Sequence, residues 1–208
     1  MVMMMSMFGT AQPALLAFPD ERPVFLREYS TNHYGVLPYF LSRLAMEMSV
    51  TAGQILLQVT ITYFMVGFQS NFGWFYLTTY ALAMSSTALA VMLGCAVEDP
   101  KLGQELLPIL FVPQMLFSGF FVVPELIPVW LRWAQYLCSL TYAVRIMAVE
   151  EFSPDTREEC GMPCEGFLNN INAEADDTWW NWLVLAALFV GFRLFGLYIL
   201  RSKAEKFY

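Results

Sequence analysis

The sequence predicts an all-α membrane protein, and three observations support this fold class. Hydrophobic residues make up 58% of the 208 residues and charged residues only 14%, whereas soluble domains contain about 25% charged residues. Apolar segments of about 20 residues recur along the chain, which is the length a helix needs to cross about 30 Å of hydrocarbon. Nine of the 18 acidic residues lie between 150 and 177, so the net charge of −7 arises largely from one solvated loop. This charge distribution argues against a nucleic-acid partner, which would need a basic surface.

Hydropathy predicts five apolar segments, the first of them short: 1–18, 45–67, 73–96, 104–123 and 179–200. The stretch 124–148 is also apolar, but two prolines and two arginines interrupt it, which disfavours a simple lipid-facing span. Amphipathic or re-entrant helices at one membrane interface fit this stretch better, with Trp130, Trp133 and Tyr136 as interfacial anchors. The N-terminus lacks the basic region of a secretory signal and resembles the end of a span.

The basic residues of the short loops predict the orientation. If the five segments alternate, three arginines lie on one side and seven basic residues lie on the other: Arg22, Arg27, Arg43, Lys101, Arg201, Lys203 and Lys206. The positive-inside rule places the larger group in the cytosol. Residues 124–178, including the loop 149–178, are then extracytoplasmic.

Two cysteines of this loop, Cys160 and Cys164, are disulfide candidates because an extracytoplasmic location is oxidising. The sequence does not define the partner of either cysteine. A structural zinc site is disfavoured, because it requires four nitrogen or sulfur ligands and the only histidine, His33, is distant in sequence.

Two charges lie within or near the predicted spans. Glu47 is expected at the cytosolic mouth of the second segment. Arg193 precedes Arg201 by eight residues, about 12 Å along a helix, so its side chain is expected to snorkel toward the cytosolic headgroups. The alternative for both residues is a conducting or coupling role.

Motifs for autonomous catalysis are missing from the sequence. A P-loop needs a Gly-Lys pair to hold phosphates, but the three lysines follow Pro100, Ser202 and Glu205. The sequence contains neither an HExxH zinc motif nor a GxSxG nucleophile elbow. We therefore expect no catalytic site, no metal site and no cofactor bound by this chain.

Five stretches, in order, cover nearly the whole chain and resemble the membrane domain of G-subfamily ATP-binding cassette (ABC) transporters, the White and pleiotropic-drug-resistance group. They are "ERPVFLREYSTNHYGVLPYFLSR", "ITYFMVGF", "MLFSGFFV", "VWLRWAQYLCSLTYAVRIMAVEEF" and "GFRLFGLYILR". The chain departs from the family pattern at Glu150, where an asparagine is common. The gap between Cys160 and Cys164 is also short, so a disulfide to a second subunit remains an alternative. The loop also lacks a glycosylation acceptor.

The resemblance implies a cytosolic contact helix at residues 20–30, which would touch an ATP-binding domain. Its pattern is compatible with a short amphipathic helix, because apolar side chains four residues apart lie beside charged ones. The implied contact residues are Glu21, Arg22, Phe25, Arg27, Glu28 and Tyr29. A simple interfacial linker is the alternative.

The resemblance also implies a substrate cavity closed by a hydrophobic gate. Phe120 and Phe121 match the gate, at which bulky apolar side chains could dewet a constriction. The implied cavity residues are Val112, Met115, Ser6 and Phe8. Such an apolar lining would favour flat or lipid-like substrates. Helix packing is the competing explanation at each of these positions.

The implied function is ATP-driven export of lipid-like or amphipathic molecules. The implied partners are an ABC nucleotide-binding domain, which would bind ATP and Mg, and a second transmembrane half in a homo- or heterodimer. The chain begins inside what resembles the second span, so we expect a truncated or split transporter, or a degenerate paralogue, in the plasma membrane or an organelle membrane. The alternatives are a non-transporting membrane protein that regulates a full-length relative, and a channel.

Overall fold

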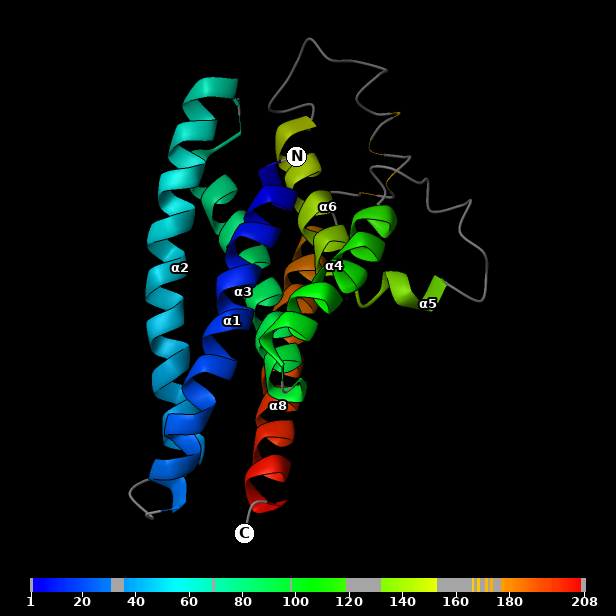
Figure 1. Cartoon of the computed structure of the whole chain (residues 1–208). Coiled ribbons are helices and arrows are strands. Elements are labelled where there is room, and N and C mark those ends of the chain that lie inside the picture. Colours follow the sequence, from blue (N-terminus) through cyan, green and yellow to red (C-terminus); the bar gives the residue numbers. More distant parts are fainter. Residues whose placement is uncertain are drawn as a thin grey trace.

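The computed structural model describes residues 2–30, 36–68, 70–97, 99–118, 132–152, 166, 168, 171, 173 and 177–206. Long helices dominate, and these residues contain no strand, which confirms the predicted all-α class. Figure 1 shows α2 along one edge of the bundle and α8 running parallel to the long direction of the bundle. The helices are α1 (Val2–Ser30), α2 (Val36–Val66), α3 (Phe72–Ala96), α4 (Pro100–Phe117), α5 (Arg132–Gln135), α6 (Ser139–Phe152) and α8 (Thr178–Lys206).

Three of these helices are long and apolar enough to cross a membrane: Leu37–Val66, Phe72–Ala96 and Thr178–Ser202. They correspond to the predicted segments 45–67, 73–96 and 179–200. The predicted segment 1–18 coincides with the shorter apolar helix Val2–Ala17 inside α1. The predicted segment 104–123 falls on α4, whose described part ends near Ser118.

Helix α3 is central because its residues are small. Its sequence from Ala81 to Ala90 is "ALAMSSTALA", and nearly all of these residues are buried. Small side chains allow neighbouring helices to approach closely, which drives helix association in membranes. The hydroxyl groups of Thr79 and Ser86 each donate to the carbonyl four residues earlier, at 2.8 Å, so they bury no unpaired donor.

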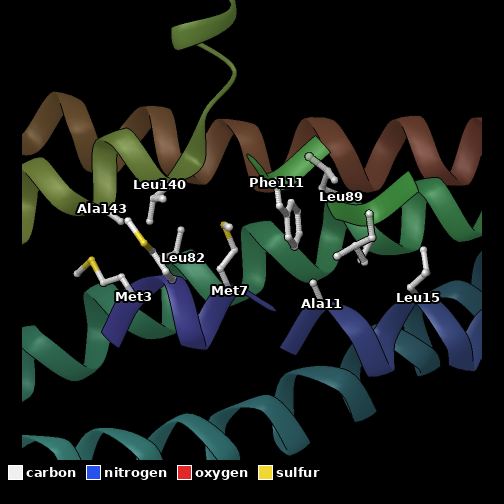
Figure 2. Close-up of a cluster of buried hydrophobic side chains, with 12 residues drawn as sticks. Met3, Met7, Ala11, Leu15, Leu82, Leu89, Phe111, Leu140 and Ala143 are labelled. Carbon is white, nitrogen blue, oxygen red and sulfur yellow. The ribbon is translucent and has the colours of Figure 1, made fainter. Parts of the chain in front are cut away.

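Helix α1 contributes a buried stripe at four-residue spacing: Met3, Met7, Ala11 and Leu15 (Figure 2). This stripe packs against Leu82 and Leu89 of α3, Phe111 of α4, and Leu140 and Ala143 of α6. The main apolar core therefore joins four helices.

Glycine permits two close contacts between helices. A Cβ atom at Gly196 would lie 3.4 Å from the Cα atom of Met92, so α8 approaches the backbone of α3 directly. A Cβ atom at Gly103 would lie 3.3 Å from the side chain of Leu15, at the contact of α4 with α1.

Several helix boundaries differ from those expected. The predicted contact helix 20–30 is a continuation of α1, without a break after residue 18. Helix α2 begins at Val36, nine residues before the predicted apolar segment, because hydropathy marks only the apolar part of a helix. Helix α6 continues to Phe152, four residues into the predicted loop 149–178. Of the predicted re-entrant stretch 124–148, residues 124–131 lie outside the described residues.

Candidate functional site

The candidate site lies where α1 meets α4, because both helices carry predicted cavity residues. Phe8 of α1 and Phe111 of α4 form an edge-to-face pair with ring centroids 5.2 Å apart. Met115 lies one turn beyond Phe111 and packs against the same core while remaining partly exposed. Val112 is 48% exposed. The structure thus places Phe8, Val112 and Met115 on two contacting helices, with Val112 presenting an apolar surface.

Ser6 has a different environment. Its side chain is fully buried, and its hydroxyl group donates to the Val2 carbonyl at 2.9 Å. The amide Nε2 of Gln58, on α2, donates to the same hydroxyl oxygen at 2.8 Å. These bonds give Ser6 a part in the packing of α1 on α2, which is the alternative that the sequence left open at this position.

Prolines interrupt the backbone hydrogen bonds of both helices. Pro13 lies inside α1 and cannot donate to the carbonyl of Gly9, four residues earlier. Nε2 of Gln54, on α2, donates to that carbonyl at 3.3 Å. In α4, Pro108 and Pro113 flank Phe111 and Val112. Gln54 was not predicted from the sequence. A usable signal was present, however: Pro13 leaves one carbonyl without its helical donor, and another apolar helix carries two glutamines four residues apart, Gln54 and Gln58.

Polar side chains fix the end of α4 to the start of α6. The hydroxyl of Ser139 donates to Oε1 of Gln114 at 3.3 Å, and the hydroxyl of Thr141 donates to the Phe117 carbonyl at 3.2 Å. Gln114 and Thr141 are almost completely buried. This clamp therefore fixes the point where α4 ends, three residues before the predicted gate. The gate residues themselves, Phe120 and Phe121, lie outside the described residues.

A separate apolar cavity of about 210 Å³ lies near the start of α1. Its lining includes Met3, Phe68, Phe75, Met147 and one carboxylate, Glu151. Glu151 is 5% exposed, and its Oε2 accepts the backbone N–H of Ser70 at 3.1 Å. This bond ties the end of α6 to the turn between α2 and α3. The burial of Glu151 could not be predicted from the sequence, because this residue belongs to a stretch rich in acidic residues that was expected to be solvated.

The other predicted positions are only partly described. The helical backbone of residues 21–29 is described, but the side chains of Glu21, Arg22, Phe25, Arg27, Glu28 and Tyr29 are not among the described groups. Cys160 and Cys164 also lie outside the described residues.

Cys95 and Cys138 are both buried. Burial raises the pKa of the Cys138 thiol to about 12, so it forms little of the reactive thiolate near neutral pH. Within the described ranges, no group of three or more His, Cys, Asp or Glu residues could hold a metal ion.

The two charges of the apolar helices meet. Nη2 of Arg193, on α8, lies 2.8 Å from Oε1 of Glu47, on α2, and the side chains are 6% and 11% exposed. The guanidinium carbon of Arg193 also lies 5.6 Å from the centroid of the Phe189 ring. The sequence predicted separate interfacial positions, because it could not show that these residues face each other.

Comparison with known proteins identifies the family. The family model described as ABC-2 type transporter matches residues 1–152. Over 95% of its length, the chain is 25% identical to "ABC transporter G family member 1" of Dictyostelium discoideum. It is 26% identical over 96% of its length to "Protein white" of Ceratitis capitata. It is 29% identical over 83% of its length to "Broad substrate specificity ATP-binding cassette transporter ABCG2" of Sus scrofa.

The aligned region spans 28%, 31% and 29% of these three relatives, respectively. The family match covers the helices that form the candidate site, α1 and α4, and continues to the end of α6. The chain therefore belongs to the ABC-2 type transporter family, as a membrane domain of the G-family ABC transporters.

Proposed function

We propose that this chain is the membrane-spanning part of an ATP-driven exporter for lipid-like or amphipathic small molecules. The observation that carries the proposal is the α1–α4 surface, formed by the exposed Val112 and the partly exposed Phe8, whose ring packs on the buried Phe111. This surface is apolar and aromatic, so a flat apolar molecule would lose little hydration by binding there. The family match supports a role in transport, and the apolar surface supports the proposed class of substrate.

The proposed exporter is completed by partners. A separate nucleotide-binding domain binds ATP and Mg and contacts residues 20–30, and a second membrane half completes the cavity. The chain crosses the membrane several times, in the plasma membrane or an organelle membrane. Residues 124–178 are extracytoplasmic, and Cys160 and Cys164 form disulfides there.

The mechanism follows from the continuity of α1. Because residues 20–30 extend the helix that carries Phe8, a movement at the contact segment passes along α1 to the cavity. Pro13 lies between the two regions. The helix is weakened there, because a proline cannot donate a backbone hydrogen bond. Phe120 and Phe121 then open as the outer gate.

The test is substrate movement in membrane vesicles that contain the chain and its nucleotide-binding partner. The vesicles are supplied with ATP and a fluorescent short-chain lipid analogue. We expect Val112→Trp to reduce export at least tenfold while ATP hydrolysis continues, because the bulky indole ring would cover the apolar surface. The control is Ile61→Trp on α2, where the residue is 60% exposed. Equal export by both variants would contradict the placement of the cavity.

The contact segment is tested in the same vesicles by the double variant Phe25→Ala/Tyr29→Ala. We expect ATP hydrolysis without export, because the two apolar side chains would anchor the segment on the ATP-binding domain. Unchanged coupling would remove this assignment. If the chain alters export only when a full-length relative is present, it is a regulator rather than part of the exporter.

A further inference from the structure

The buried pair Glu47–Arg193 is not used by the proposed transport function. It joins α2 to α8 through the contact of 2.8 Å between Oε1 and Nη2. Charged side chains inside apolar helices are rare and usually have a defined partner, because removing a charge from water is costly. The pair therefore requires an explanation of its own.

Both residues lie well inside their helices. Glu47 follows the start of α2 by 11 residues, about 16 Å along the axis, and Arg193 follows the start of α8 by 15 residues, about 22 Å. These depths do not fit two independent residues at helix ends. They fit one contact within the bundle.

Several other contacts of α2 point to different helices or are apolar. Gln54 and Gln58 donate to groups of α1. The hydroxyl groups of Tyr76 and Tyr80, on α3, donate to the carbonyls of Ala52 and Met48, both at 3.3 Å. Toward its start, α2 packs Phe40 in an apolar cluster with Val91, Cys95 and Leu200. Apolar packing of this kind tolerates small rotations and shifts of one helix along another.

We propose that Glu47 and Arg193 are a positioning pair that fixes the rotation and depth of α2 against α8. The attraction between two opposite charges depends on their separation, whereas the apolar contacts beside the pair define no such distance. Buried polar pairs are known to specify helix register at little or no gain in stability. The inference concerns helix packing and does not depend on the transport role.

The first measurement separates positioning from stability, using thermal unfolding of the full chain in lipid nanodiscs. Glu47→Gln and Arg193→Gln, each alone, should lower the Tm by about 10 °C, because each leaves one buried charge unpaired. The double variant Glu47→Gln/Arg193→Gln should regain most of this loss, since it buries no charge. The control is Glu105→Gln, which removes an exposed carboxylate of α4. A double variant as unstable as the single ones would overturn the proposal.

The second measurement is the distance between α2 and α8 in the double variant, which remains folded. Spin labels are attached at Leu41→Cys and Leu194→Cys, positions that are 54% and 61% exposed, in a chain whose own cysteines are replaced by alanine. We expect the double variant to show a broader distance distribution, or one shifted by as much as a helical turn of about 5.4 Å. Glu105→Gln should retain the narrow parent distribution. An unchanged distribution in the double variant would overturn the proposal.

Discussion

Helices α2 and α3 are both long and apolar, yet they associate with the rest of the molecule by different means. Within the apolar window of each helix, 72% of the residues of α3 are buried, against 17% of those of α2. Helix α3 packs through alanine, serine and threonine residues that let its neighbours come close. Helix α2 exposes large side chains such as Leu57 and Phe64, and polar groups join it to its neighbours in addition to the apolar contacts of Phe40, Ile55 and Val59.

The difference shows how helices associate when their surroundings are themselves apolar. Lipid solvates a leucine as well as a protein interior does, so apolar area alone does not favour helix association in a membrane. Close packing of small residues then serves the central helix, and polar contacts supplement the apolar packing of the peripheral one. Three substitutions test this comparison, each with a matched control.

The largest effect is expected for the same substitution made on the two helices. Phe75 on α3 is 2% exposed and stacks near Phe68, with ring centroids 4.8 Å apart, whereas Phe64 on α2 is 78% exposed. Phe75→Ala should lower the free energy of unfolding by about 3–5 kcal/mol, because it leaves a cavity. Phe64→Ala should change it by less than about 0.5 kcal/mol. Thermal unfolding in nanodiscs measures both, and equal losses would show that the helices are equally packed.

A somewhat smaller effect is expected from separating α8 and α3. Gly196→Leu introduces a side chain where a Cβ atom already meets the Met92 backbone at 3.4 Å. Overpacking should lower the free energy of unfolding by about 1–3 kcal/mol. Gly191→Leu, on the same helix, is the control, because a Cβ atom there meets nothing within 4 Å. If Gly191→Leu destabilises the protein as much, the effect arises from the altered sequence of α8 and not from the contact.

The smallest effect is expected for a polar contact of α2. Gln54→Leu removes the donor to the Gly9 carbonyl, which Pro13 leaves without its helical partner. The loss should be about 0.6 kcal/mol, the average for hydrogen bonds between membrane helices, and at most about 1.7 kcal/mol. Gln12→Leu replaces an exposed glutamine on α1 as the control. Hydrogen exchange at the backbone around Gly9 should also increase in Gln54→Leu, and unchanged exchange would mean that the amide does not restrain α1.

Local sequence properties determined the fold class and three apolar helices. Hydropathy located α2, α3 and α8, because a helix long enough to cross hydrocarbon needs about 20 apolar residues in succession. The reading of 124–148 as re-entrant helices stays a prediction; within it the structure describes α5 and most of α6. The order of five short stretches indicated the family, which the comparison of known proteins confirms.

Tertiary structure alone decided which helix is central and which polar groups meet. The sequence of α3 is apolar around its whole circumference. It therefore indicates that the helix can be buried, but it does not indicate which helices pack around it. Glu47 and Arg193 are 146 positions apart, and Gln54 and Gly9 are 45 apart, so no local pattern pairs them. Glu151 was misjudged for the same reason: it follows Glu150 in an acidic stretch, yet it binds the Ser70 amide 81 positions away. Hydropathy and spacing are properties of neighbouring residues, whereas these contacts exist only once the helices are placed side by side.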